Sequence, residues 1–297
     1  MTLGQILINS VGKLNQRQIT NPHLEAEILL SKILKKPREF ILAHPEKQLT
    51  KLQITNYKLL IAKRTKGIPI AYLTGHKQFY GLDFLVNRNA LIPRPETELM
   101  VEETLSLITR SSQPATLIDV GTGSGCIIIT LAKQLQTSKF IAIDISKKAL
   151  MVARQNAKMH QVNKKIKFIK SNLLARFIHN SSFTIHHSLI ILANLPYLTP
   201  TQIKNSPSIK HEPKLALTAG SDGLKYYKQL FKQAKESQVA SYGLRNIYIL
   251  CEINPGQTAK MKQLIKRELP EASRQIKKDL SGLNRLAIIS INTQSKL

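Results

Sequence analysis

The stretch ATLIDVGTGSGCIIITLA, residues 115–132, decides the fold of this chain. An apolar run at 116–120 ends in three glycines at alternate positions, Gly121, Gly123 and Gly125, and a second apolar run with helical potential follows at once. Glycine lets a backbone turn sharply and approach a ligand closely, so the pattern predicts a strand, a tight turn and a helix. The G-x-G-x-G spacing differs from the G-x-G-x-x-G of dinucleotide binders, and the Lys-Ser/Thr of a P-loop is missing.

Strands and helices alternate from this loop onward. Apolar runs fall at 116–120, 140–145, 166–169, 189–193 and 247–253, with helical stretches near 125–136, 147–160, 222–236 and 257–268 and a last strand at 286–291. This alternation predicts an α/β fold, a doubly wound and mainly parallel sheet with helices on both faces. Ligands of such sheets bind at the carboxyl ends of the strands.

The residues before the loop predict a separate helical unit. Asn21-Pro22 begins an apolar helical stripe that Pro37 ends, and a further helix is expected at 51–63. Alternating residues at 75–87 predict a hairpin, and two prolines at 93 and 95 predict a rigid linker into a helix. We therefore expect a helical-bundle domain at 1–72, a β-hairpin and proline-rich linker at 73–95, and the α/β domain at 96–297.

Composition limits the classes of protein. The formal net charge is +26, with 13 basic and 5 acidic residues in 1–85 and 31 and 13 in 86–297, so the excess is spread along the chain. Diffuse positive charge steers a protein toward a polyanion such as RNA, although a general richness in Lys, Ile and Asn can also reflect codon bias. No apolar run is long enough to span a bilayer, so no membrane contact is expected. The acid-free first 24 residues have some likeness to an organellar transit peptide, but their helical spacing favours a structural helix.

No metal site is predicted. Cys126 and Cys251 lie in apolar surroundings without the spacing of metal ligands, so we expect buried thiols in a reducing compartment. The polar segment 176–188 is expected to form an irregular loop. Its adjacent His186 and His187 would point apart on an extended backbone, which argues against shared ligation of a metal.

Asp144 is the second element of the predicted site. It ends the second strand about twenty residues beyond the glycine loop, where a carboxylate can accept hydrogen bonds from both hydroxyls of a ribose. NAD and S-adenosylmethionine both satisfy that arrangement. The loop spacing and the lack of a pyrophosphate-binding arrangement favour S-adenosylmethionine, with Ser171 and Asn172 flanking the adenine.

The third element is Asn194-Leu195-Pro196-Tyr197, directly after the fourth strand. A planar NH₂ group is a poor nucleophile because its lone pair is delocalised. The side-chain oxygen of Asn194 and the backbone carbonyl of Leu195 can accept its two hydrogens, and Tyr197 can pack against the planar group. The motif therefore predicts transfer of a methyl group to a planar nitrogen, without a strong general base.

Several segments together resemble the HemK/PrmC family, the N5-glutamine methyltransferases of peptide chain release factors. The resemblance runs almost end to end through PHLEAEILLSKIL, PIAYLTGHKQFYGLDFLVN, LIPRPETELMVE, DVGTGSGCI, AIDIS, ANLPY, HEPKLALTAGSDGLKYY and DLSGLNRLAII. The proline-rich linker is the most family-specific, because other amino-methyltransferases share the glycine loop and the N-P-P-Y type motif.

The resemblance implies a Rossmann-like class I methyltransferase domain that uses S-adenosylmethionine. The implied acceptor is the glutamine of the Gly-Gly-Gln motif in release factors 1 and 2, with the N-terminal domain helping to hold that protein and a role in translation termination. The implied cofactor residues are Asp119, Gly121, Thr122, Gly123, Ser124, Gly125, Asp144, Asn172, Leu173 and Asn194. The implied substrate and catalytic residues are Asn194, Leu195, Pro196 and Tyr197.

Three positions depart from the family pattern. Leu195 replaces the second residue of N-P-P-Y, where only the backbone carbonyl is needed. Asn172 replaces an aspartate and removes a charge from the cofactor pocket, and Asn254 stands where a glycine of Glu-x-Gly is usual. None of these changes removes a group that the mechanism requires.

Other classes remain as alternatives. An rRNA adenine N6-dimethyltransferase commonly carries N-L-P-Y and would suit the positive charge, but that family opens almost directly with its glycine loop, whereas about 115 residues precede it here. A DNA adenine methyltransferase would need a target-recognition region, and we find none in the sequence. A non-catalytic binding module of the same fold is disfavoured by the intact Asp144, Asn194 and Tyr197. We expect a bacterial cytoplasmic protein rather than a mitochondrial one.

Overall fold

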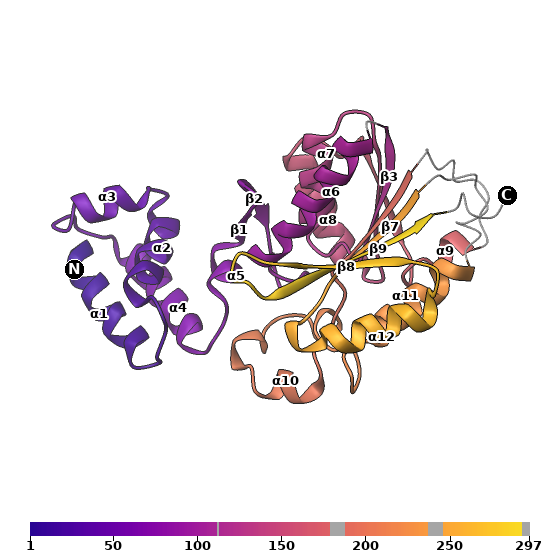
Figure 1. The fold of residues 1–297 in the computed structure, drawn as a ribbon. Helices are drawn as coiled ribbons and strands as arrows, with labels where there is room; N and C mark the ends of the chain where they lie inside the picture. The colour runs from indigo at the N-terminus through magenta and orange to yellow at the C-terminus, as the bar shows by residue number, and fades with distance from the viewer. Residues whose placement is uncertain (112, 179–187, 237–245, 293–297) are drawn as a thin grey trace. The chain divides into compact units, whose positions relative to one another are not determined.

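The computed structural model describes residues 1–111, 113–178, 188–236 and 246–292, and they form two compact units (Figure 1). One unit consists of residues 1–76 with 206–211, and the other consists of residues 77–205 with 212–297. The predicted His186 and His187 lie outside the described residues. In the described part of the chain, no helix has both the length and the apolar character needed to cross a membrane.

Residues 1–76 of the first unit form a bundle of five α-helices. They are α1 (Leu3–Asn15), α2 (Pro22–Leu34), α3 (Arg38–Ala43), α4 (Lys51–Thr65) and α5 (Ile70–Thr74). Leucine and isoleucine side chains of these helices form one buried cluster, and the hydroxyl of Tyr57 inside it donates to the carbonyl of Ala26 at 3.1 Å. Burial raises the pKa of Tyr57 to about 12. Glu25 at the start of α2 forms an ion pair with Arg64 of α4 at 2.5 Å, which ties these two helices together.

The second unit begins with a hairpin, a proline-containing turn and a helix. These are β1 (His76–Phe79), β2 (Leu82–Leu85), the 3-10 helix η1 (Pro95–Thr97) and α6 (Glu98–Ser111). Phe79 and Phe84 of the hairpin are fully buried against the α/β core. Asn156, a buried residue of α8 (Lys147–Met159), donates to the carbonyls of Leu85 and Ser124 and accepts from the amide of Leu85. One amide side chain thereby joins the hairpin to the glycine loop.

A seven-stranded sheet is the centre of the second unit. Its strands are β3 (Ala115–Val120), β4 (Lys139–Asp144), β5 (Ile166–Lys170), β6 (Ser188–Ala193), β7 (Asn246–Glu252), β8 (Ser273–Lys278) and β9 (Asn284–Asn292). The order is β5-β4-β3-β6-β7-β9-β8, parallel from β5 to β7, with β9 antiparallel to both of its neighbours. The predicted mainly parallel sheet is confirmed. The order reverses between β4 and β6 around β3, which is where ligands of open α/β sheets bind.

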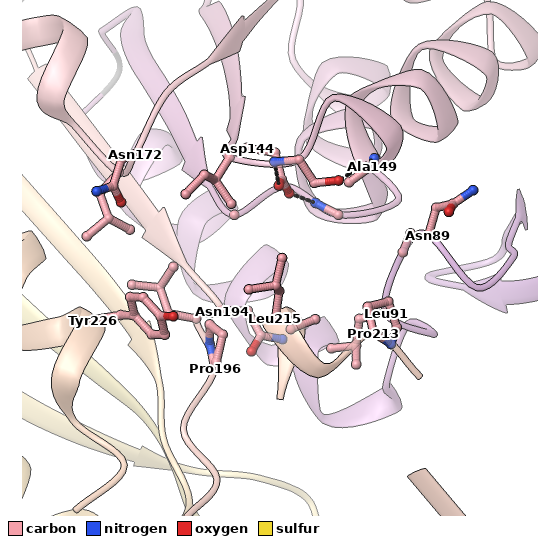
Figure 2. Close-up of a pocket in the computed structure, with 18 of the residues that line it drawn as sticks. Asn89, Leu91, Asp144, Ala149, Asn172, Asn194, Pro196, Pro213, Leu215 and Tyr226 are labelled. Carbon is pink, nitrogen blue, oxygen red and sulfur yellow. Dashed lines mark hydrogen bonds between the residues drawn. The ribbon is translucent and has the colours of Figure 1, made fainter. Parts of the chain in front are cut away.

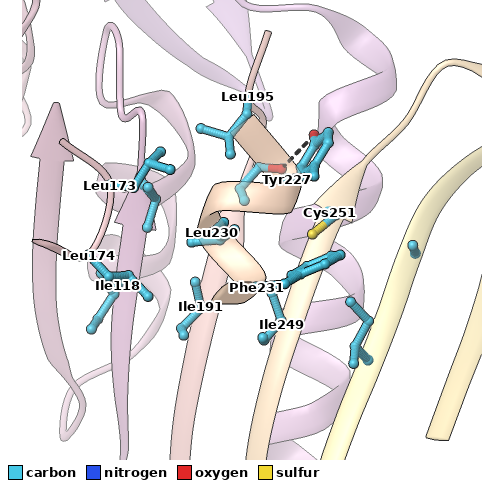
Figure 3. Close-up of a cluster of buried hydrophobic side chains, with 14 of the residues drawn as sticks. Ile118, Leu173, Leu174, Ile191, Leu195, Tyr227, Leu230, Phe231, Ile249 and Cys251 are labelled. Carbon is cyan, nitrogen blue, oxygen red and sulfur yellow. Dashed lines mark hydrogen bonds between the residues drawn. The ribbon is translucent and has the colours of Figure 1, made fainter. Parts of the chain in front are cut away.

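Helices cover both faces of the sheet (Figure 1). On one face α11 (Lys225–Glu236) and α12 (Thr258–Glu268) pack on alternate strand residues such as Ile118, Ile191 and Ile249 (Figure 3). On the other face α6, α7 (Cys126–Gln134) and the hairpin pack on the intervening residues, such as Leu117 and Ile190. Every residue of β3 and β6 is buried, because both faces of these central strands are covered. Both cysteines are buried and free.

Several short elements were not expected from the sequence. β8 reads SRQIKK, whose side chains are exposed or half-buried, so it lacks the apolar alternation of a strand. The helix α9 (Ala175–Ile178) occupies the start of the segment for which we expected an irregular loop. The helix α10 (Pro200–Lys204) and the 3-10 helices η2 (Pro207–Ile209), η3 (Lys214–Ala216) and η5 (Pro255–Gln257) are one or two turns long, too short for periodicity to reveal.

Candidate active site

A cavity lies at the carboxyl ends of β3, β4, β5 and β6. Its lining comes from residues 89–91, Gly121, Gly123, residues 144–146, Ala149, residues 171–173, residues 194–196, Pro213, Leu215, Ala216 and Tyr226. Figure 2 shows Asp144 and Asn172 along one side, with Asn194, Leu215 and Tyr226 along the other. The structure thus brings the glycine loop, Asp144 and the Asn194 motif to one cavity. Of the predicted residues, Asp119, Thr122, Ser124, Gly125 and Tyr197 do not line it.

The glycine loop is held against β4. The amides of Gly121 and Thr122 both donate to the carbonyl of Ile143, at 2.8 and 2.9 Å. A Cβ atom added to Gly121 would lie 3.1 Å from a methyl of Leu195, whereas one added to Gly123 would meet only the Gly121 carbonyl oxygen, at 3.9 Å. Because both glycines line the cavity, their missing side chains leave backbone exposed to whatever occupies it.

Asp119 lies beneath the loop. Its side chain is 1% exposed, and one carboxylate oxygen accepts from the Thr122 hydroxyl at 2.6 Å. Burial raises the pKa of Asp119 to about 7, with the nearby charge of Asp144 adding to the shift and the Thr122 hydroxyl opposing it. The other oxygen, Oδ1, is buried and has no hydrogen bond among the described residues. Asp119 therefore holds the glycine loop through its hydrogen bond with Thr122.

Asp144 borders the cavity directly. Its two oxygens accept from the amides of Gly123 at 3.0 Å and Ser146 at 2.8 Å. Burial raises the pKa of Asp144, and these amide donors oppose the shift. Each carboxylate oxygen can accept more than one hydrogen bond, so acceptor capacity remains for a ligand. Ser146 also caps α8 by accepting from the Ala149 amide at 3.2 Å, which fixes the turn after Asp144.

Asn172 and Leu173 follow β5 at the same edge of the sheet. Asn172 is exposed, and its carbonyl accepts from the side chain of Gln233 at 3.5 Å. The amide of Leu174 donates to the same Gln233 side chain at 2.8 Å. Leu173 is buried and has a φ of 51°. The buried Gln233 of α11 thus holds the turn that presents Asn172 to the cavity.

Asn194 projects from the end of β6 and is linked to a buried carboxylate. Its Nδ2 donates to the Thr97 hydroxyl at 3.0 Å, and that hydroxyl donates to Glu252 Oε2 at 2.6 Å. The Tyr197 hydroxyl donates to the other oxygen of Glu252 at 3.1 Å. Among the described residues, Asn194 Oδ1 accepts no hydrogen bond. Burial raises the pKa of Glu252, and burial beside the Glu252 charge raises that of Tyr197.

Leu195 and Tyr197 are anchored on the inner side of the motif. Leu195 is 3% exposed, and its side chain packs against Gly121, so it joins the end of β6 to the glycine loop. The carbonyl of Tyr197 accepts from the side chain of Gln257 at 2.8 Å. Gly223, with a φ of 71°, is required beside it, since a Cβ there would lie 2.3 Å from the Tyr197 carbonyl oxygen.

A buried ion pair holds two further walls of the cavity. Glu212 has a side chain only 2% exposed, and its carboxylate accepts from the guanidinium of Arg94 and from the amide of Ile92 at 3.2 Å. The cavity-lining residues 89–91 come just before Ile92 in the sequence, and Pro213 and Leu215 come just after Glu212. The ion pair therefore joins the proline-rich linker to the segment after residue 211.

Sequence reasoning missed Thr97, Glu252, Glu212 and Tyr226 as contributors to this site. Glu252 carried a usable signal, because an acidic residue at the end of a buried apolar strand repeats the placement of Asp144. Thr97 had no such signal, since it stands between Glu96 and Glu98 in a polar stretch just after the proline-rich linker. Asn254, which departs from the family pattern, accepts from the Gly256 amide at 3.0 Å and so begins η5.

Comparison with known proteins agrees with this geometry. A family model described as a methyltransferase domain matches residues 111–241, and the PrmC N-terminal domain model matches residues 5–75. The catalytic domain of human METTL16, bound to a hairpin of the MAT2A 3′UTR, is similar in fold with a TM-score of 0.55 at 16% identity, covering 81% of each chain. The fold and the cavity at its switch point define a methyltransferase domain.

Two curated relatives identify the family. The release factor glutamine methyltransferase of Bacillus anthracis is 33% identical over 269 residues, covering 89% of this chain and 91% of that protein. That of Koribacter versatilis is 38% identical, covering 80% and 82%. The chain belongs to the release factor glutamine methyltransferase family. It is also 33% identical to a bifunctional methyltransferase of Rickettsia typhi, where it spans 52% of the length of that protein.

Proposed function

We propose that this chain transfers a methyl group from S-adenosylmethionine to the side-chain amide nitrogen, N5, of the glutamine in the Gly-Gly-Gln motif of release factors 1 and 2. The observation that carries the proposal is the state of the Asn194 amide. Its NH₂ group donates to Thr97, its oxygen accepts no hydrogen bond among the described residues, and Asn194 is one of the residues that line the cavity. A free carboxamide oxygen is the acceptor that a planar NH₂ substrate needs.

The residues of the cavity fit the proposed cofactor. Gly121 and Gly123 leave bare backbone beside Asp144, whose remaining acceptor capacity suits the two hydroxyls of a ribose. Asn172, Leu173, Ile145 and Ala149 form an adjacent wall with a largely apolar character that suits a purine ring. Bound S-adenosylmethionine would supply an electrophilic methyl group on a sulfonium.

The chain's own residues then orient the acceptor. Asn194 Oδ1 and the Leu195 carbonyl accept the two hydrogens of the glutamine NH₂ group, which directs the nitrogen lone pair toward the methyl group. Bound S-adenosylmethionine would supply the methyl group and leave as S-adenosylhomocysteine, and the nitrogen would lose one hydrogen as a proton to water. Pro196 restricts the backbone that carries the second acceptor. We keep Tyr197 as a proposed contact of the substrate amide, although Tyr197 does not line the cavity and its hydroxyl donates to Glu252.

The alternatives have less support. An rRNA adenine dimethyltransferase shares the N-L-P-Y motif, but the PrmC N-terminal domain model matches residues 5–75, before the glycine loop. That match supports a release factor as the partner that the N-terminal unit helps to hold. Relatives in bacteria support the bacterial cytoplasm as the location.

One assay separates these possibilities. The protein is incubated with methyl-labelled S-adenosylmethionine and, separately, with a release factor, the same factor with its Gly-Gly-Gln glutamine replaced by alanine, and ribosomal RNA. We expect label on the release factor and none on its alanine variant. Label on RNA alone would refute the proposal, and no label on any acceptor would favour a binding module.

We also propose a weak contact with RNA through the face formed by α8 and β5. Residues 145–211 contain eleven lysines and arginines and no acidic residue. Along α8 and β5, Lys147, Lys158 and Lys170 are exposed, together with Met151 at 60%. Clustered cations of this kind bind phosphates in a salt-dependent manner.

The test of this contact measures binding of a ribosomal RNA fragment over a range of salt concentration. We expect the double substitution Lys147→Glu/Lys158→Glu to weaken binding about tenfold or more at low salt. The control, Lys13→Glu/Lys58→Glu, makes the same change of charge at exposed positions of α1 and α4. Equal weakening by both pairs would show that the diffuse charge, and not this face, attracts RNA.

A further inference from the structure

Three segments far apart in the sequence meet in one chain of hydrogen bonds behind the cavity. Thr97 comes from η1, Asn194 from the end of β6 and Glu252 from the end of β7. The order is Asn194 Nδ2 to Thr97 Oγ1 at 3.0 Å, then Thr97 Oγ1 to Glu252 Oε2 at 2.6 Å. Thr97 and Glu252 are each 2% exposed, and neither lines the cavity.

The chemistry of the threonine hydroxyl makes this chain directional. A hydroxyl has one hydrogen to donate and can accept at its lone pairs. The Thr97 hydroxyl donates its one hydrogen to Glu252 Oε2. The Thr97 oxygen can therefore only accept from Asn194, which selects the NH₂ end of that side chain. The carboxamide oxygen is left without a hydrogen-bond partner among the described residues, on a residue that lines the cavity.

Glu252 also fixes the other end of the Asn194 motif. Its Oε1 accepts from the Tyr197 hydroxyl at 3.1 Å, and its backbone carbonyl accepts from the Tyr227 hydroxyl. A carboxylate in an apolar core is costly unless donors surround it. Each of the two carboxylate oxygens of Glu252 has a donor. One donor is Thr97, which binds Asn194, and the other is Tyr197, the last residue of the Asn194 motif.

We propose that Thr97 and Glu252 are positioning residues, which hold the Asn194 side chain with its oxygen directed at the substrate amide. This inference rests on the proposed function, because it assigns the two residues to the same methyl transfer. Without the hydroxyl of Thr97, both amide orientations of Asn194 become available, and one of them presents NH₂ to the NH₂ of the substrate. In that orientation Asn194 offers no hydrogen-bond acceptor to the substrate amide, so the enzyme turns over slowly.

The principal test replaces Thr97 with valine, which has the same shape and lacks the hydroxyl. Since a small misplacement of a positioning group can cost up to about 100-fold in rate, we expect kcat to fall about 10- to 100-fold. The KM for the release factor and the dissociation constant of S-adenosylhomocysteine should change less than about threefold, because neither Thr97 nor Glu252 lines the cavity. Thr97→Ser keeps the hydroxyl and should recover kcat to within about fivefold of the wild type.

The chain offers a matched control in Thr104. It is fully buried in α6, seven residues beyond Thr97, but its hydroxyl donates only to the Met100 carbonyl one turn before it. Thr104→Val removes an equally buried hydroxyl without touching the site, so its kcat should stay within about twofold of the wild type. Equal losses in Thr97→Val and Thr104→Val, or no recovery in Thr97→Ser, would overturn the proposal.

A second measurement does not depend on the substrate. The side-chain NH₂ resonances of Asn194 are assigned by their disappearance in Asn194→Asp, and we expect them to shift in Thr97→Val and to stay in place in Thr104→Val. Unchanged resonances in Thr97→Val would refute the hydrogen-bond chain. If the wild-type protein methylates no release factor while these resonances behave as expected, the proposed function fails and the hydrogen-bond chain stands.

Discussion

Substitution of Gly125 tests which glycines of the loop stabilise the fold and which ones affect ligand binding. Its φ of 82° is in the left-handed region, which costs a residue with a side chain about 1–2 kcal/mol. A Cβ there would lie 2.7 Å from a methyl of Ile129 and 3.2 Å from the Cβ of Ala153. The Ile129 methyl can move, but the contact with Ala153 remains, and overpacking of this kind costs about 1–3 kcal/mol. We therefore expect Gly125→Ala to lower the free energy of unfolding by about 2–5 kcal/mol.

Two other glycines serve as controls for this substitution. Gly81, in the hairpin turn, has a φ of 72° and nothing within 4 Å of an added Cβ, so Gly81→Ala should lose only about 1–2 kcal/mol. Gly123 has a φ of 56° and lines the cavity, so Gly123→Ala should be similarly mild in stability. It should however weaken binding of S-adenosylhomocysteine by about tenfold or more, because its methyl group would enter the cavity.

Urea unfolding followed by far-ultraviolet circular dichroism measures the stabilities, and calorimetric titration measures the affinities. Gly125 does not line the cavity, so its alanine variant should keep its affinity for S-adenosylhomocysteine wherever it remains folded. The reasoning is refuted if Gly125→Ala is no less stable than Gly81→Ala. It is refuted in a different way if Gly123→Ala binds as tightly as the wild type, because the ligand would then lie elsewhere.

Three further predictions follow from individual contacts. Asn194→Ala should reduce turnover on a release factor by about 100-fold or more while S-adenosylhomocysteine still binds, and loss of that binding in a titration would show a different role for Asn194. Asn156→Ala removes an amide that holds Leu85 and Ser124, so urea unfolding should show a loss of about 2–4 kcal/mol; a loss below about 1 kcal/mol would contradict this account. Because the folded-state pKa of Asp119 is raised from 3.8 to about 7, the folded state holds its proton longer than the unfolded state, and stability should fall as pH rises between these values. Asp119→Asn should remove up to about 1.4 kcal/mol per pH unit from that slope, and an unchanged slope in urea titrations from pH 4 to 8 would rule the explanation out.

The sequence predicted the central elements of the fold because their patterns are local. An apolar run that ends in G-x-G-x-G gives β3, its loop and α7 without help from any distant residue. The same holds for the apolar runs that became β4, β6 and β7. Edge strand β8 escaped detection because its residues contact the sheet mainly through backbone hydrogen bonds to β9, which leave no mark on side-chain composition.

The candidate site divides in the same way. Gly121, Gly123, Asp144 and Asn194 could be predicted, because residues that follow parallel strands must gather at one edge of the sheet. The sequence could not show that Tyr197 turns its hydroxyl inward to Glu252, since that direction depends on a buried partner 55 residues away.

The sequence alone determined the fold class, the glycine loop, and the meeting of Asp144 and Asn194 at the carboxyl edge of the sheet. Tertiary structure alone decided which way the Asn194 amide faces. That orientation depends on Thr97, 97 residues earlier, and on Glu252, 155 residues beyond Thr97. The physical reason is that a carboxamide has two nearly isosteric ends, and only the donors and acceptors that folding places around it distinguish one end from the other.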